Sequence, residues 1–304
     1  MALKITRASD PITVERLNTV IYGPPGLGKT SLAFTAEAPL LLDFDNGSHR
    51  AANRKDAVLV SDWSDVAEMT ADDLEPFKTI IVDTAGRALD VLTADIIKTN
   101  PKLGRGGALT LQGYGELKSR FTSFLKLLNS FGKDVVLIAH MDEQRSGDDI
   151  VERLDVQGGS KGEIYKAADA MGRLVLANGK RRLLFSPTDA AFGKNPGQLE
   201  PLLVPETSSP SFDGFLASVI QRIKDRLNEM TEAQREAMAE QQWFRDTLPE
   251  VADADAINAL IERANAAGPA CKVMLHNRAK EIGLIFDKSE GCYAEKQKAE
   301  SEAA

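Results

Sequence analysis

The sequence predicts an α/β fold, in which helices flank a mainly parallel sheet, followed by a helical C-terminal extension. Short runs of β-branched and apolar residues alternate with helical segments, which is the order that builds a parallel sheet. Beyond residue 205 the composition changes to helix-forming residues. We therefore expect a core domain over residues 1–205, a helical region over 206–293 and a charged, disordered tail over 294–304.

Length and composition exclude several classes of protein. The chain has 304 residues and 43% apolar content, which suits about two globular domains. No apolar run is long enough to cross a membrane, and the N-terminus lacks the apolar core of a signal peptide. The two cysteines, Cys271 and Cys292, fit neither a disulfide framework nor a repeated metal spacing. We expect a cytoplasmic protein with no membrane partner.

The charge distribution bears on nucleic-acid binding. A net charge of −8 argues against a protein that coats nucleic acid with its whole surface. The segment from Gly86 to Lys133, however, carries more basic than acidic residues. This pattern is compatible with a local anion-binding face, although a solvated helix surface would give the same pattern.

One stretch of the chain fits the phosphate-binding loop G-x-x-x-x-G-K-[ST]. It reads Gly23-Pro24-Pro25-Gly26-Leu27-Gly28-Lys29-Thr30 and lies between an expected strand, Thr19–Tyr22, and an expected helix that begins near Ser31. Glycines let backbone amides approach phosphates, and a helix N-terminus adds partial positive charge. We expect residues Gly23 to Ser31 to bind ATP, with Lys29 on the β- and γ-phosphates and Thr30 on Mg²⁺. The alternative is an ordinary Pro/Gly turn with a chance lysine.

Two later strands end in carboxylates. Pro39–Asp45 reads as a buried strand closed by the turn signal Asn46-Gly47. Lys78–Asp83 is a run of apolar and β-branched residues that ends in an acid, the form of a Walker B aspartate. Because it accompanies a phosphate-binding loop, we expect Asp83 to hold Mg²⁺ directly or through water.

A further buried strand, Asp134–His140, ends in a histidine. Ligands of open α/β sheets bind at the carboxyl ends of the strands, so this end should lie beside the phosphate-binding loop. His140 is therefore a candidate sensor of the γ-phosphate or of the attacking water. The alternative is a histidine that only forms a hydrogen bond near the strand end.

The remaining elements follow from periodicity and turn signals. Asn178-Gly179 predicts a β-hairpin between the strands 173–177 and 182–185. The segment 99–107 reads as a flexible, basic, glycine-rich loop, and 141–162 as a polar loop with several glycines. Helices are expected at 87–98, 114–130, 163–171, 212–228, from 253 or 255 to 267, and at 271–282.

Motifs point to a family by resemblance. The loop spelling resembles AAA+ ATPases, but Asp83 is followed by Thr84, where those enzymes have a catalytic glutamate. The order of elements resembles RecA-like ATPases. Within that group, three runs look like a phage-type group of RecA-core proteins used as single-strand annealing recombinases. These runs are Ile81–Gly86, Leu111–Gly115 and Ile138–His140, and the resemblance covers about residues 17–195.

The resemblance implies a RecA-like P-loop NTPase core and roles for particular residues. The general base of the family, usually a glutamate, would be Asp45 or Asp43, and the shorter aspartate implies slow hydrolysis. Loops 99–113 and 142–162 would face single-stranded DNA. The candidate phosphate contacts in these loops are Lys102, Arg105, Arg145 and Lys161.

The resemblance also implies assembly. ATP would lie between neighbouring subunits of a filament or ring, and Lys180 and Arg182 of the hairpin would reach a neighbour's ATP as cationic fingers. The alternative is that both are exposed hairpin charges. Further partners would be single-stranded DNA and a single-strand-binding protein, and this protein would lie in the host cytoplasm if a phage encodes it.

Three functions from different classes remain after these observations. The first is an ATP-dependent single-stranded-DNA-binding protein of recombination or annealing, with slow ATP hydrolysis. The second is an AAA+-like motor ATPase that acts on duplex DNA or protein. The third is a nucleotide-controlled module whose helical C-terminal region binds a protein partner.

Overall fold

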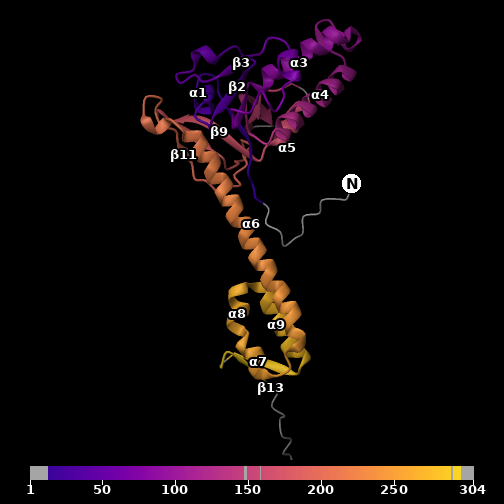
Figure 1. The fold of residues 1–304 in the computed structure, drawn as a ribbon, viewed down its shortest axis with the longest axis vertical. Helices are drawn as coiled ribbons and strands as arrows, with labels where there is room; N and C mark the ends of the chain where they lie inside the picture. Colours follow the sequence, from indigo (N-terminus) through magenta and orange to yellow (C-terminus); the bar gives the residue numbers. More distant parts are fainter. Residues whose placement is uncertain (1–12, 147–148, 158, 289, 296–304) are drawn as a thin grey trace, which may run out of the picture. The chain divides into compact units, whose positions relative to one another are not determined.

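The chain folds into two compact units, which are described separately. The computed structural model describes residues 13–146, 149–157, 159–288 and 290–295 (Figure 1). One unit, called here the core unit, comprises Val14–Leu227, and the chain from Asn228 onward belongs to the other, called here the C-terminal unit. The division falls inside one long helix, whereas the sequence suggests a boundary at 205/206.

A single sheet organises the core unit. Its strands lie in the order β11-β10-β9-β1-β7-β4-β2-β3, and β8 pairs with β7 outside this path. The six strands from β9 to β3 are parallel, while β10, β11 and β8 pair antiparallel with their neighbours. The bounds are β1 (Asn18–Gly23), β2 (Pro39–Asp43), β3 (Ala57–Leu59), β4 (Thr79–Asp83), β7 (Asp134–Ser146), β8 (Asp149–Leu154), β9 (Ala170–Ala177), β10 (Lys180–Leu184) and β11 (Leu202–Leu203).

Helices cover both faces of this sheet. Successive side chains of β1 point to opposite faces, so that Val20 and Tyr22 enter one hydrophobic cluster and Ile21 enters the other. The first cluster packs against α3 (Ala85–Thr99), α4 (Leu111–Ser130) and α5 (Ser160–Ala167), and the second against α1 (Lys29–Ala33) and the start of α6 (Phe215–Thr247). The predicted fold class, a mainly parallel sheet flanked by helices with helices following, is confirmed.

The two predicted loops have more regular structure than expected. Much of 142–162 is a β-hairpin, because β7 continues past His140 to Ser146 and pairs with β8. The segment 99–113 contains the short helix η2 (Pro101–Leu103) and the two-residue strands β5 (Gly104–Arg105) and β6 (Ala108–Leu109). Helix α4 then begins at Leu111, because the Thr110 hydroxyl caps it by accepting a hydrogen bond from the Gly113 amide. Short elements complete the unit: η1 (Ser48–Arg50), α2 (Ser64–Ala67) and η3 (Pro210–Phe212).

The C-terminal unit has its own core and is not purely helical. Helix α6 extends to Thr247, well past the predicted end at 228, and its last residues pack with α7 (Ala254–Ala259), α8 (Ile261–Ala267) and α9 (Pro269–Glu281). The short helix η4 (Leu248–Glu250) joins α6 to this group. A hairpin of β12 (Leu284–Asp287) and β13 (Cys292–Glu295) closes the unit. Two residues of the predicted disordered tail, Ala294 and Glu295, are therefore in a strand, and 296–304 lie outside the described residues.

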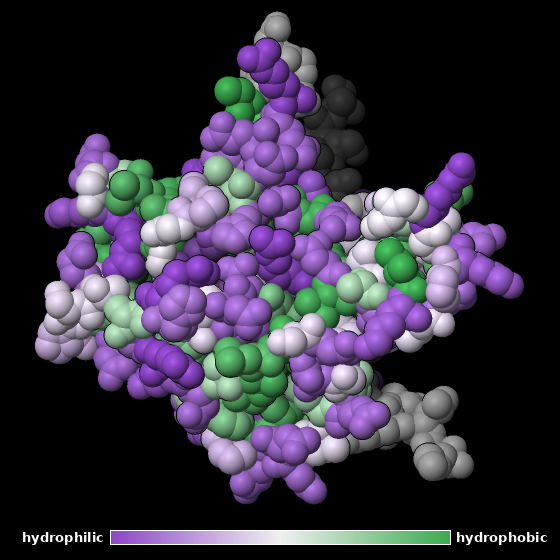
Figure 2. Space-filling model, turned by 90° about the horizontal axis from the view of Figure 1, so that it is seen from above, coloured by the Kyte–Doolittle hydropathy of each residue, from purple (hydrophilic) through white to green (hydrophobic). Residues whose placement is uncertain are grey.

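Hydrophilic residues cover most of the face drawn in Figure 2, with smaller hydrophobic patches between them. No helix in the described part of the chain combines the length and apolar character needed to cross a bilayer. Cys271 is buried and Cys292 half-buried, and both are free thiols.

Candidate nucleotide-binding site

The loop from β1 to α1 has a backbone that requires glycine. Gly26 and Gly28 both have φ of 79°, in the left-handed region that favours glycine. At Gly23, a Cβ atom would collide with the backbone carbonyl oxygen of Leu174 on β9. The strand–glycine turn–helix context predicted from sequence is therefore present.

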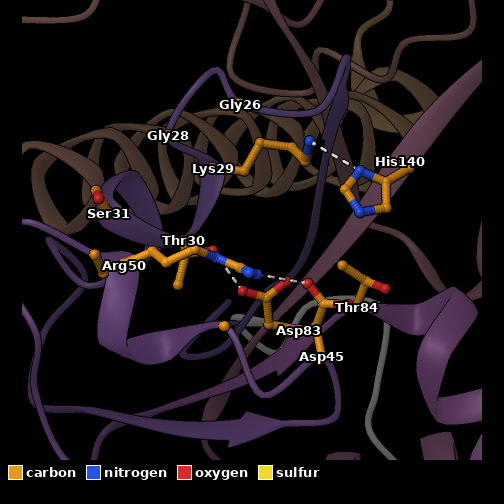
Figure 3. A pocket seen from close by; sticks show the side chains of 12 residues that line it. Gly26, Gly28, Lys29, Thr30, Ser31, Asp45, Arg50, Asp83, Thr84 and His140 are labelled. Atoms are coloured by element: carbon orange, nitrogen blue, oxygen red, sulfur yellow. Dashed lines mark hydrogen bonds and ion pairs between the residues drawn. The ribbon is translucent and has the colours of Figure 1, made fainter.

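This loop borders a cavity of about 240 Å³ at the carboxyl ends of the parallel strands (Figure 3). The residues that line it come from the loop, from the segments after β2 and β4, and from β7. They are Gly26, Gly28, Lys29, Thr30, Ser31, Asp45, Gly47, Arg50, Ala51, Asp83, Thr84 and His140. The position agrees with the rule that ligands of α/β sheets bind beyond the carboxyl ends of the strands.

Lys29 lines the cavity and is buried, with 5% of the residue exposed. Its ammonium group donates hydrogen bonds to the carbonyl oxygens of Gly23 and Pro24, at 2.9 and 2.8 Å. Its Nζ also lies 3.3 Å from Nδ1 of His140, toward which it points in Figure 3. Burial lowers the pKa of Lys29 to about 8, against the opposing effect of Asp83 and Asp45.

Thr30 and Asp83 supply hard oxygen ligands on the opposite side. The Thr30 hydroxyl donates to Oδ2 of Asp83 at 2.5 Å, and Asp83 is 4% exposed. Burial raises the pKa of Asp83 to about 6, so a cation beside it would stabilise its charge. The pair fits Mg²⁺. Among the described residues no group of three or more His, Cys, Asp or Glu side chains could hold a metal alone, so phosphate and water would complete the ligand set.

The raised pKa of Asp83 predicts a pH-dependent stability effect of the substitution Asp83→Asn. The folded chain favours the protonated carboxyl, so the stability it contributes is lost as pH rises through about 6. At pH 8 without nucleotide or metal, we expect the variant to be more stable by on the order of 3 kcal/mol, because the pKa rises from 3.8 to about 6 and each pKa unit corresponds to about 1.4 kcal/mol. At pH 5 the gain should shrink.

Thermal unfolding of the full chain at both pH values measures this effect. The matched control is Asp56→Asn, because Asp56 is exposed. An equal shift at pH 5 and pH 8 would contradict the expectation.

The two acids near the end of β2 have different surroundings. Asp43 is fully buried, and its two carboxylate oxygens accept hydrogen bonds from the backbone amides of Gly47 and Ser48 at 3.0 and 2.9 Å. Asp45 instead lines the cavity. Of the two candidates for the general base, Asp45 is therefore the one whose carboxylate faces the place of the phosphates.

Two arginines that the sequence did not single out hold Asp45. Nη2 of Arg50 lies 3.2 Å from one carboxylate oxygen, and Nε of Arg87 lies 3.3 Å from the other. Figure 3 shows Arg50 and Asp45 pointing toward one another. Arg87 also contacts Asp90 at 3.1 Å, and Gln157 donates to the same Asp90 at 2.5 Å. Arg50 and Arg87 each follow the end of a buried strand, β2 or β4, by a few residues. This position is a weak sequence signal, because many surface arginines share it.

His140 lies between the nucleotide cavity and a second, polar cavity of about 280 Å³. Burial and the nearby Lys29 lower the pKa of His140, which favours the neutral ring, and in the tautomer that carries its proton on Nε2 the Nδ1 atom accepts from the Lys29 ammonium. Its backbone oxygen accepts a hydrogen bond from Asp155, just after β8. His140 is thus linked both to the phosphate-binding lysine and to the end of the β7–β8 hairpin.

The basic residues of the β9–β10 hairpin point in alternate directions. Lys180 and Arg182 are exposed and do not line the cavity. Arg181, between them, points the other way. Its Nη1 lies 3.1 Å from where a Cβ of Gly28 would be, and its Nη2 donates to the Pro205 carbonyl at 2.7 Å. The sequence could not distinguish these three until the register of β10 was known.

The four candidate DNA contacts lie away from the nucleotide cavity. Lys102 and Arg105 are exposed on η2 and β5, and Arg145 is exposed on β7. Lys161 is half-buried in the first turn of α5. None of the four lines the cavity.

The glycine loop, the buried lysine and the threonine–aspartate pair together define the class of P-loop ATPases. The chain belongs to the AAA domain family, which it matches over residues 15–196, more than half of its length. Among solved structures it is similar to the KaiC-like protein of the hyperthermophilic archaeon Pyrococcus horikoshii OT3. That similarity has a TM-score of 0.30 and 11% identity, over 57% of this chain and 79% of the other. A comparison with curated proteins gives no match.

Proposed function

We propose that this P-loop ATPase binds single-stranded DNA in an ATP-dependent manner, as a recombination or annealing protein, and hydrolyses ATP slowly. The observation that carries the nucleotide part is the cavity in which Lys29, Thr30, Asp83 and Asp45 meet. The DNA part is supported by exposed basic residues in the segment 99–113, which follows α3, and in the β7–β8 hairpin.

The residues that line the cavity would have different roles in ATP hydrolysis. Backbone amides from Gly26 to Thr30 would bind the phosphates, and Lys29 would exchange its two carbonyl partners for phosphate oxygens. Thr30 and Asp83 would hold Mg²⁺, which neutralises charge on the phosphates. Asp45 would accept the proton of the attacking water. An aspartate must approach that water more closely than a glutamate, which is the reason we expect slow turnover.

The DNA-binding surface we propose consists of Lys102, Arg105, Arg145 and Lys161. Lys102 and Arg105 lie beside the tight turn at Gly106 and Gly107, and Arg145 lies near the end of β7. Single-stranded DNA is bound largely through its phosphates, which requires exposed cations rather than a deep cavity. We also propose self-assembly into a filament or ring, in which the exposed Lys180 and Arg182 reach a neighbour's nucleotide.

Fluorescence anisotropy of a labelled single-stranded oligonucleotide tests the proposal. We expect tighter binding with a slowly hydrolysed ATP analogue than with ADP, and loss of this difference in Lys29→Ala. Lys102→Ala/Arg105→Ala should reduce the slope of log affinity against log salt by roughly 1.4, since each single-strand phosphate contact contributes about 0.7.

The matched control for the charge loss is Lys126→Ala, an exposed lysine of α4 outside the proposed surface. Equal affinity in every nucleotide state would reject the DNA part. Stimulation of ATP hydrolysis by duplex DNA or by a protein instead would support the second candidate, a motor ATPase, with which the AAA domain family is equally consistent.

A further inference from the structure

The C-terminal unit contains a cavity of about 430 Å³ that the proposed ATPase activity does not use. It lies between α8, α9 and the hairpin of β12 and β13. Leu275 and Tyr293 contribute to its lining and are 3% and 8% exposed. Ile285 and Phe286 of β12 also line it but are 51% and 38% exposed. Two large apolar side chains thus remain in water beside an open cavity, which is characteristic of a binding surface.

Aromatic contacts give the cavity a fixed wall. The rings of Phe286 and Tyr293 meet edge to face with their centroids 4.9 Å apart. The Tyr293 hydroxyl lies 3.2 Å from Nδ1 of His276, so its polar end has a partner. A wall held in this way can receive an apolar side chain without first having to be ordered.

The charges at the cavity have one sign. Lys272 of α9 and Lys288, which follows β12, are both exposed and line it, and no acidic residue does. No ion pair between residues that the structure describes involves either lysine. The whole chain carries a net charge of −8, so a positively charged apolar cavity is a local exception.

The composition of residues 1–12 and 296–304 does not match this surface. Residues 296–304 contain no apolar side chain larger than alanine, so they have nothing to fill the cavity. Residues 1–12 carry Lys4 and Arg7 against one acid, so their charge has the same sign as that of Lys272 and Lys288. The surface is complementary to a segment that is acidic and carries large apolar side chains.

We propose that this surface, defined by Leu275, Ile285, Phe286 and Tyr293 with Lys272 and Lys288, binds a short acidic peptide segment of a partner protein. A large apolar side chain of the segment enters the cavity against Tyr293 and Phe286. Its carboxylates contact the two lysines. Buried apolar anchors supply most of the affinity in such complexes, and the charges select the partner.

Anisotropy with the full chain and three labelled eight-residue peptides tests this proposal. The first peptide has one phenylalanine and one leucine among aspartates. The second replaces the aspartates by lysines, and the third replaces the two apolar residues by serines. We expect the first peptide to bind at least tenfold more tightly than either of the others.

Variants of the chain identify the surface. Lys272→Glu/Lys288→Glu should weaken binding of the aspartate peptide at least tenfold and create affinity for the lysine peptide. Phe286→Ser should weaken binding of the aspartate peptide to the original chain and of the lysine peptide to the double variant. Lys280→Glu is the matched control, because Lys280 is an exposed lysine of α9 that does not line the cavity. Circular dichroism verifies that each variant folds.

Three results would overturn the proposal. One is equal affinity for the first and third peptides, which would remove the apolar anchor. The second is an equal loss of binding in Lys280→Glu, which would indicate unspecific charge attraction. The third is binding to vesicles of anionic lipid without binding to the peptide. None of these results depends on ATP, so the proposed ATPase function is tested separately.

Discussion

Replacing Lys29 by alanine is expected to weaken ATP binding by a hundredfold or more without unfolding the chain. Among the residues that line the cavity, Lys29 and Arg50 are cationic while Asp45 and Asp83 are acidic. Without Lys29 the phosphates would face two carboxylates with one exposed arginine to offset them. Hydrogen bonds that involve charged groups contribute about 1.5–3 kcal/mol each, and about 3 kcal/mol corresponds to a hundredfold change in affinity.

The measurement is titration with a fluorescent ATP analogue, once with Mg²⁺ and once with a chelator. Lys55→Ala, an exposed lysine outside the cavity, is the control and should bind as the original chain does. Because burial lowers the pKa of Lys29 to about 8, the lysine loses its charge as pH rises above that value. Affinity without metal should therefore fall between about pH 8 and pH 9.5 in the original chain. An unchanged affinity of Lys29→Ala for the ATP analogue would contradict the proposal that this loop binds the phosphates of ATP.

The sheet and the phosphate-binding loop could be predicted because local sequence determines them. The run before Asp83 is apolar and β-branched at every position, and it forms β4 with all five residues buried. Gly26 and Gly28 of the loop are required by their left-handed backbone angles, which belong to the loop itself. Fold class and the place of the nucleotide therefore follow from short segments.

Features that depend on pairing between distant segments could not be predicted. The β7–β8 hairpin contains polar residues such as Arg145, and their exposure on a two-stranded ribbon leaves no apolar pattern to detect. The hairpin β12–β13 is fixed by packing on α9, where Leu284 and Tyr293 join the core of the C-terminal unit. The direction of Arg181 depends on the register of β10 against β9. In each case tertiary contacts decide what the local sequence leaves open.

The second large effect is expected at Asp45. Asp45→Asn should lower the rate of ATP hydrolysis at least a hundredfold while ATP still binds, because an amide cannot accept the proton of the attacking water. Asp43→Asn is the informative comparison. Its carboxylate already accepts two backbone hydrogen bonds inside the fold, so we expect a loss of stability from this variant. Single-turnover hydrolysis and urea unfolding of both variants separate the two effects.

We expect Arg50 to restrain the carboxylate of Asp45 until nucleotide binds. The carboxylate of Asp45 accepts one hydrogen bond at each oxygen, from Arg50 and from Arg87, and these contacts fix its position while each oxygen keeps a lone pair for a proton. The Arg50 side chain is 64% exposed, and such ion pairs contribute only about 0–1 kcal/mol, so a polyphosphate can displace Asp45 from Arg50 at little cost. Bound ATP would then free the base that hydrolyses it.

Arg50→Ala should accordingly raise KM about tenfold or more and leave kcat within a fewfold, whereas Asp45→Asn should lower kcat. Arg54→Ala, an exposed arginine four residues further along, is the control and should change neither constant. If Arg50→Ala lowers kcat as much as Asp45→Asn does, Arg50 acts on the transition state. That result would contradict the proposal that ATP acts by displacing Asp45 from Arg50. If Asp45→Asn hydrolyses ATP at the original rate, the base lies elsewhere, and His140 becomes the residue to replace next.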